Sequence, residues 1–150
     1  MVAEVHPGAA SRPGAGMAGL EARMRRLVAP RDGTVSPAER AALNHLEAGG
    51  RRLRARFGLQ AGCALGLVPG TAEALAAGAE LLHNASLVHD DLKDGDCTRR
   101  GRASVWAAFG SDVAICAGDL MISGSFAAVA PAVPDRAGAS PSSGDRRVFG

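Results

Sequence analysis

The chain has 150 residues, a length that suits one domain of ordinary size. Hydrophobic residues make up 47% of it and charged residues 21%, so a packed core is possible. The formal net charge is only +2, which is too small to argue for nucleic-acid binding. Aromatic residues are only 3%, so most of the core must come from aliphatic side chains. A chain rich in Ala and Leu with few β-branched runs favours helices, and we predict an all-α fold.

The cysteine spacing and the apolar stretches bear on cellular location. Cys63, Cys97 and Cys116 have no metal-ligand or redox spacing, and we predict reduced thiols in a cytoplasmic protein. No secretory signal is visible at the N-terminus. The most apolar stretch, residues 113–122, is short and is interrupted by Asp119, so we expect no membrane span.

The first segment is low in apolar periodicity. Residues 1–16 are rich in Gly, Ala, Pro and Ser, and we expect a disordered leader there. A short amphipathic helix is predicted over residues 17–29. Pro30 and the turn-forming pair Asp32-Gly33 should end it.

The second helix has a clear predicted start. Ser36 can cap it, Pro37 occupies the first helical position, and Glu39 completes a capping box. The pair Gly49-Gly50 should end this helix. A further helix is predicted over residues 51–66.

The longest periodic segment runs from Thr71 to Asp94 and predicts one long helix with a broad apolar face. Gly78 falls on that face. An interior Gly costs about 1 kcal/mol relative to Ala, so Gly78 is either a weak point in the helix or a place where a neighbouring helix packs closely. The sequence does not choose between the two.

The rest of the chain divides into four predicted parts. Residues 95–103 are polar and contain Gly, which predicts a loop, and residues 104–108 predict a short turn of helix. Residues 111–129 predict another apolar helix. After Ala130, Pro and Gly alternate with Ser, Asp and Arg, so we expect a disordered tail over residues 131–150.

Three carboxylates lie near the end of the long predicted helix: Asp90, Asp91 and Asp94. Residues four apart differ by roughly 40° in direction and roughly 6 Å in height, so Asp90 and Asp94 share a face. Carboxylate oxygens at this spacing suit Mg²⁺, which binds one or two carboxylates together with water and substrate phosphate. The simpler alternative is a solvated acidic helix end.

Two arginine pairs favour the metal-site interpretation. Arg99 and Arg100 begin five residues after Asp94, and the Arg guanidinium group binds phosphate oxygens in a bidentate manner. Arg51 and Arg54 lie on one face at the predicted start of a helix, where backbone N–H groups also favour an anion. A carboxylate pair that binds metal beside an arginine pair is what a diphosphate substrate requires. The Arg51 and Arg54 pair could by itself be an ordinary solvated face, but two separate phosphate-type sites are more informative than either alone.

At this point the motifs resemble a known family. The segment from Glu80 to Asp94, followed by Arg99-Arg100-Gly101, is similar to the first aspartate-rich region of the trans-isoprenyl (polyprenyl) diphosphate synthases. The upstream Gly-Gly-Arg-Arg-Leu-Arg resembles that family's Gly-Gly-Lys-Arg-x-Arg element, with Arg51 in place of Lys. Phe109-Gly110 and Ala117-Gly118-Asp119 also match. The resemblance covers roughly residues 36–129 and implies the N-terminal part of the isoprenoid synthase helical bundle.

The resemblance implies an activity and roles for the aspartates. The family condenses isopentenyl diphosphate with an allylic prenyl diphosphate to lengthen an isoprenoid chain. Asp90 and Asp94 would coordinate Mg²⁺ that bridges the allylic diphosphate, and Asp91 would support them. The expected reaction is ionisation of the allylic C–O bond, attack by the isopentenyl double bond, and loss of a proton.

It also implies roles for the basic residues. Arg99 would contact the allylic diphosphate and Arg100 the diphosphate of isopentenyl diphosphate. Arg51, Arg54 and His83 would complete the latter site. Without the resemblance, a histidine on a helix face is more often a structural residue.

The resemblance further implies a chain-length pocket. In the family, the fourth and fifth residues before the first aspartate face the growing chain, and bulky aromatic side chains there stop elongation early. Here these residues are Ser86 and Ala85, both small. We therefore expect products of C20 or longer.

Family members are about twice as long as this chain, form homodimers, and carry a second aspartate-rich motif. The printed sequence has no second such motif. A chain cut before that motif would leave apolar helix faces exposed. One alternative is thus a non-catalytic subunit or degenerate remnant that associates with a full-length synthase. Another alternative is a class I terpene cyclase. The Arg99-Arg100-Gly101 segment and the upstream arginine cluster argue against it, because a cyclase has no second diphosphate substrate to hold.

Overall fold

The computed structural model of the protein describes residues 13–29 and 33–132. These residues form six α-helices, a short β-hairpin between the fourth and fifth helices, and a final 3₁₀ turn. The helices are α1 (Pro13–Val28), α2 (Pro37–Glu47), α3 (Leu53–Ala64), α4 (Pro69–Asp94), α5 (Val105–Phe109) and α6 (Ser111–Val129). The hairpin strands are β1 (Thr98–Arg99) and β2 (Arg102–Ala103), and the 3₁₀ turn is η1 (Ala130–Ala132). The predicted all-α fold is confirmed.

Most element boundaries lie within two residues of the predictions, and the largest differences are in two places. Helix α1 begins at Pro13 rather than at residue 17, because Pro is tolerated in the first helical turn, where N–H groups have no helical partner. The predicted loop over residues 95–103 contains the β-hairpin, whose two-residue strands are too short to leave a periodic signal. The rest of the predicted leader, residues 1–12, and residues 133–150 of the predicted tail lie outside the described residues.

The start of α2 follows its capping residues. The Glu39 backbone N–H donates to Ser36 Oγ at 3.2 Å, and the Ser36 backbone N–H donates to Glu39 Oε2 at 2.7 Å. These two bonds satisfy N–H groups that have no partner within the helix, so the capping box predicted from the sequence is confirmed.

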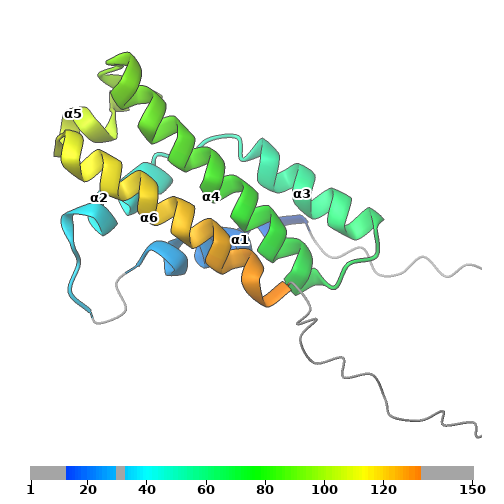
Figure 1. The fold of residues 1–150 in the computed structure, drawn as a ribbon. Coiled ribbons are helices and arrows are strands. Elements are labelled where there is room, and N and C mark those ends of the chain that lie inside the picture. Colours follow the sequence, from blue (N-terminus) through cyan, green and yellow to red (C-terminus); the bar gives the residue numbers. More distant parts are fainter. Residues whose placement is uncertain (1–12, 30–32, 133–150) are drawn as a thin grey trace, which may run out of the picture.

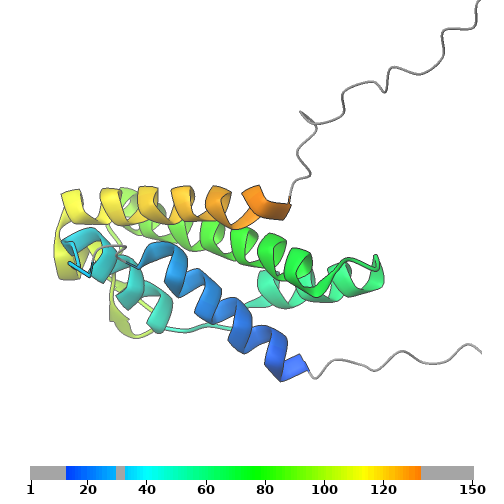
Figure 2. The same ribbon diagram turned by 90° about the horizontal axis from the view of Figure 1, so that it is seen from below.

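The helices pack in two layers. Helices α4 and α6 lie side by side along most of their length, as both views show (Figures 1 and 2). Helices α1, α2 and α3 lie on one side of that pair (Figure 2), with α3 packed on α4 and α2 packed on α6. The long helix α4 therefore runs through the centre of the described structure and carries the predicted aspartate motif at its C-terminal end.

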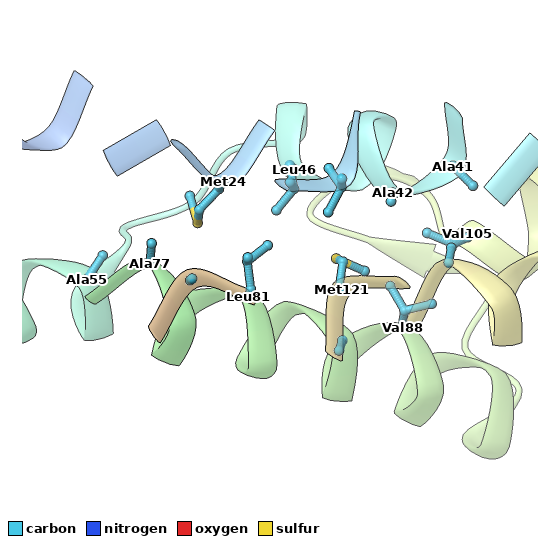
Figure 3. Close-up of a cluster of buried hydrophobic side chains, with 14 of the residues drawn as sticks. Met24, Ala41, Ala42, Leu46, Ala55, Ala77, Leu81, Val88, Val105 and Met121 are labelled. Carbon is cyan, nitrogen blue, oxygen red and sulfur yellow. The ribbon is translucent and has the colours of Figure 1, made fainter. Parts of the chain in front are cut away.

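The core lies between these layers. Met24 and Leu46, from α1 and α2, point toward Leu81 and Met121, from α4 and α6, and all four are almost fully buried (Figure 3). Much of the remaining core is alanine, in keeping with the composition. Small side chains let the helix backbones approach closely, which makes the packing sensitive to added volume.

Gly78 marks one such close approach, between α4 and α6. A Cβ atom at Gly78 would lie 2.8 Å from Val129 Cγ1 and 3.1 Å from the Ser125 backbone oxygen. The second distance involves backbone, which cannot rotate away. Of the two explanations that the sequence left open, close packing by a neighbouring helix is the correct one.

We therefore expect Gly78→Ala to destabilise the protein. Ala improves the helix propensity by about 1 kcal/mol, whereas overpacking a tight contact typically costs about 1–3 kcal/mol. A lower urea midpoint at unchanged slope is the expected result. Gly70→Ala is the matched control, because Gly70 lies in the first turn of α4 with nothing within 4 Å of its Cβ position. Equal or higher stability of Gly78→Ala would show that α6 can shift freely.

Helix α6 is long and apolar enough to cross a membrane by length and composition alone, and it is the one helix of this kind among the described residues. It packs against α4, α2 and α1, and Ala114, Ala117, Met121 and Ala128 are fully buried there. Its apolar character thus fits a helix of the protein core, in line with the expectation that residues 113–122 do not span a membrane.

Candidate functional site

The three carboxylates of the aspartate motif differ in their surroundings. Asp90 and Asp94, one turn apart at the C-terminal end of α4, are exposed. Asp91 points the other way and is only 1% exposed. No group of three His, Cys, Asp or Glu side chains in residues 13–29 and 33–132 is arranged to hold a metal ion. Asp90 and Asp94 are the pair that could take one together with substrate oxygens.

Asp91 is bound to Arg99 of β1. Arg99 Nε donates to both carboxylate oxygens of Asp91, at 2.8 and 2.7 Å, and Arg99 Nη2 donates to Oδ1 as well. This hydrogen bonding raises the pKa of Arg99, and the nearby carboxylates of Asp96 and Asp90 act in the same direction. The pair anchors the β-hairpin to the end of α4.

The hairpin turn presents Arg100. Arg100 and Gly101, the two residues between the strands, both have positive φ angles, 53° and 75°, as in the tight turns that match the twist of a hairpin. The exposed Arg100 side chain reaches the segment before α3, where a Cβ atom on Gly50 would lie 2.5 Å from Arg100 Nη1. The absence of a side chain at Gly50 therefore makes room for the guanidinium.

His83 of α4 lies close enough to several arginine side chains for their positive charge to affect its pKa. Its pKa is lowered, first by burial and then by Arg54, with smaller effects from Arg100 and Arg99, while Glu80 raises it. Arg51 and Arg54 are exposed at the start of α3. The structure thus brings Arg54, His83 and Arg100 into one neighbourhood, although about fifty residues separate the two arginine motifs in sequence.

Asp90 and Asp94 lie near the C-terminal end of α4, whereas Arg54 lies near His83, closer to the middle of that helix, and neither of two pockets in the described residues encloses both groups. A pocket of about 380 Å³ lies against Arg23, Thr71 and Ala74, toward the opposite end of α4. A much smaller one lies beneath the hairpin, against His45, Arg100 and Ser104. Neither is lined by Asp90 or Asp94.

The predicted chain-length pair is split by the helix geometry. Ser86 is exposed, and its hydroxyl donates to the His83 backbone oxygen at 2.8 Å. Ala85 is 1% exposed and belongs to the hydrophobic core. Successive helical residues point about 100° apart, so only one of the two can face outward here. Ala85 therefore lies in the described core, and Ser86 is the member of the pair that faces outward.

Comparison with known proteins decides the family. The family model described as polyprenyl synthetase matches residues 37–139, more than half of the chain and most of the segment from α2 onward. The chain belongs to the polyprenyl synthetase family.

Curated relatives of this polyprenyl synthetase chain include isoprenyl and geranylgeranyl diphosphate synthases. It is 42% identical over 90 residues to the short chain isoprenyl diphosphate synthase of Methanothermobacter thermautotrophicus, which is 60% of this chain and 28% of that protein. It is 46% identical over 72 residues to the geranylgeranyl diphosphate synthase of Mycobacterium tuberculosis, which is 48% of this chain and 21% of that protein. The chain therefore spans less than half the length of these relatives.

Solved structures agree on the fold. An isoprenoid synthase family member from Thermotoga neapolitana superposes with a TM-score of 0.71 at 34% identity, over 78% of this chain and 46% of that one. Heptaprenyl diphosphate synthase from Staphylococcus aureus superposes with a TM-score of 0.75 at 25% identity, over 86% of this chain and 40% of that one. The described helices thus correspond to less than half of a polyprenyl synthetase fold.

Sequence reasoning missed several buried polar residues that lie near the predicted site residues. Arg52, between the two predicted ligands Arg51 and Arg54, is buried, as are Glu80 and His45. One signal was available: Glu80 lies among apolar residues of α4, where an unpaired carboxylate would be costly. That signal called for a buried cation, and the structure supplies it as Arg52, with Nη1 3.6 Å from Glu80 Oε1.

Proposed function

We propose that this chain contributes the N-terminal half of a prenyltransferase site that condenses isopentenyl diphosphate with an allylic prenyl diphosphate. The observation that carries the proposal is the contact of the hairpin with the segment before α3. It brings Arg100 close to Arg54 and His83, on the helix that bears Asp90 and Asp94 about two turns farther toward its C-terminus. Family membership supports the same activity.

The metal part of the site would consist of Asp90 and Asp94. Both are exposed and share a face of α4, and two carboxylates leave room for the water and phosphate oxygens that complete Mg²⁺ coordination. Bound Mg²⁺ would offset the charge that develops on the departing diphosphate. Asp91 would support this site by holding the guanidinium of Arg99, which would then contact the allylic diphosphate.

The second diphosphate would lie among Arg51, Arg54, Arg100 and His83. The arginine guanidinium groups supply charge and paired N–H donors for phosphate oxygens. Burial and then the charge of Arg54 lower the pKa of His83 in the absence of ligand, and even a neutral imidazole ring can donate one hydrogen bond to a phosphate oxygen. Exclusion of water by apolar walls would protect the allylic cation.

The remaining part of such a site must come from other chain segments, because the chain spans less than half of its relatives. The second candidate function is a non-catalytic subunit that associates with a synthase, or a homodimer subunit. Exposed large apolar side chains favour association; they include Leu53, Phe57, Leu65, Val68, Leu82, Ile115 and Phe126. All three cysteines are free and exposed, which fits the proposed cytoplasmic location.

The decisive experiment measures binding and turnover separately. The purified chain is incubated with Mg²⁺, geranyl diphosphate and labelled isopentenyl diphosphate, while titration calorimetry follows each ligand. Formation of extractable labelled product would support a prenyltransferase. Ligand binding without product formation would support a non-catalytic subunit. Asp90→Asn with Asp94→Asn should abolish the Mg²⁺-dependent binding of geranyl diphosphate, whereas Glu47→Gln, an exposed acid on α2, should not. Absence of binding by the unmodified chain would overturn the proposal.

Chain length gives a further prediction. If the exposed face of α4 before Asp90 lines the prenyl-binding pocket, Ser86→Phe should weaken binding of C15 and C20 allylic diphosphates and leave C10 binding nearly unchanged. Any products should shorten accordingly. Ala85→Phe is a contrasting variant, because Phe in the core should lower stability by about 1–3 kcal/mol or more. Equal affinities of Ser86→Phe for all three lengths would remove this face from the pocket.

A further inference from the structure

We propose that Arg52 is a positioning residue that sets the geometry of the isopentenyl diphosphate site, an inference that rests on the proposed function. Arg52 is 7% exposed, while Arg51 before it and Arg54 after it are exposed. Its charge therefore faces the protein interior rather than a ligand. A buried guanidinium is retained only where partners compensate its loss of water.

Those partners come from three different helices. Arg52 Nη2 donates to the Leu46 backbone oxygen at the end of α2, at 2.5 Å. Arg52 Nη1 donates to Asn84 Oδ1 of α4 at 3.4 Å and lies 3.6 Å from Glu80 Oε1. Arg52 Nε lies 3.6 Å from Glu21 Oε1 of α1. One side chain thus ties the start of α3 to α1, α2 and α4.

The backbone conformation of Arg52 indicates that contacts with the surrounding helices hold the residue in place. Its φ angle is 47°, in the left-handed region that residues other than Gly seldom adopt, and it follows Gly49 and Gly50, which also have positive φ angles. The only other non-glycine residue with a positive φ among the described residues is Arg100, whose guanidinium packs at Gly50. Such conformations persist where surrounding contacts determine them, and they concentrate at functional sites.

Glu80 links the contacts of Arg52 to both α3 and α4. Its Oε2 accepts a hydrogen bond from the Ala55 backbone N–H at 3.1 Å and so caps α3, whose own N-cap residue, Arg52, makes no side-chain cap bond. Asn84 Nδ2 donates to the Glu80 backbone oxygen at 2.7 Å and lies 3.4 Å from Oε1. We name Arg52, Glu80 and Asn84 the Arg52 cluster.

The Arg52 cluster connects the two groups that would hold the second diphosphate. On α3 it fixes the first turn, which carries Arg54. On α4 it occupies positions 80 and 84, which enclose His83 within one turn. A shift of this cluster would move Arg54 and His83 relative to each other while leaving Asp90 and Asp94, more than one turn farther along α4, in place.

The test compares affinity for two ligands in the full chain. Titration calorimetry at 10 °C measures isopentenyl diphosphate, and separately geranyl diphosphate with Mg²⁺, for the unmodified chain, Arg52→Met and Arg52→Lys. Arg56→Met, an exposed arginine four residues along α3, is the matched control. Misplaced binding groups can cost up to about 100-fold, so we expect Arg52→Met to weaken isopentenyl diphosphate binding about 10-fold to 100-fold. Geranyl diphosphate binding should stay nearly unchanged, and Arg52→Lys should be intermediate.

Glu80→Gln provides a second variant in case Arg52→Met does not fold, because it keeps the side-chain size and leaves Arg52 in place. It should show the same selective loss. Equal affinities in all variants, or an equal loss for both ligands that follows the fall in melting temperature, would reduce Arg52 to a structural residue and overturn the inference. Failure of the unmodified chain to bind either ligand would overturn the proposed function instead, and the inference with it.

Discussion

Lowering the pH from 7 to 4 should reduce the stability of the protein by about 3 kcal/mol through His45 alone. His45 of α2 is 6% exposed, beneath the β-hairpin. Burial, followed by the charge of Arg100, lowers its pKa from 6.5 to about 4. Arg99 adds to this effect, while Asp91 and a hydrogen bond with Asn84 oppose it.

The direction follows from proton binding. Between pH 6.5 and 4 the unfolded chain binds a proton at His45 that the folded protein excludes, so stability rises with pH over this window. The contribution is fully present above about pH 6.5 and is lost as the pH falls toward 4. A pKa lowered by about 2.5 units corresponds to about 3 kcal/mol.

Urea unfolding at pH 7, 6, 5 and 4.5 measures this dependence. His45→Gln, which cannot take up a proton, should lose most of the pH dependence over that range while other titrating groups continue to contribute equally to both proteins. A variant whose stability falls as steeply as that of the unmodified chain would show that His45 is not the group responsible. The result also bears on the site, because a protonated His45 would repel Arg100.

Replacing Arg99 by Met should cost about 2–4 kcal/mol of stability. Asp91 is 1% exposed, and in the described structure its carboxylate binds Arg99 through Nε and Nη2. Removing one partner of a buried ion pair typically costs about 3–5 kcal/mol, and the 28% exposure of the Arg99 side chain reduces that figure.

Two controls separate the ion pair from the hairpin. Arg102→Met changes the exposed residue opposite Arg99 in the hairpin and should alter stability by less than about 0.5 kcal/mol. Arg99→Met combined with Asp91→Leu removes both charges and should recover part of the loss. A loss of equal size in Arg102→Met would assign the effect to the hairpin instead.

Local sequence patterns predicted the helices well. The capping residues Ser36 and Glu39 located the start of α2, and the glycine after Asp94 marks the end of α4. These signals depend on backbone groups within one or two turns, so the sequence contains all the partners involved. The aspartate and arginine motifs likewise located the end of α4 and the start of α3, and they identified the family before any fold was known.

Local patterns could not predict which of two adjacent residues is buried, because distant segments of the chain form the surroundings of each side chain. Asp90 and Asp91 are adjacent and chemically identical, yet one faces solvent and the other binds Arg99. Arg51 and Arg52 differ in the same way, since only the meeting of α1, α2 and α4 buries the second. Burial depends on which elements pack around a side chain, and that arrangement exists only once the helices have assembled. The residue types and their order therefore determined the family to which this chain belongs, and the tertiary structure decided which of those side chains face solvent and which hold the others in place.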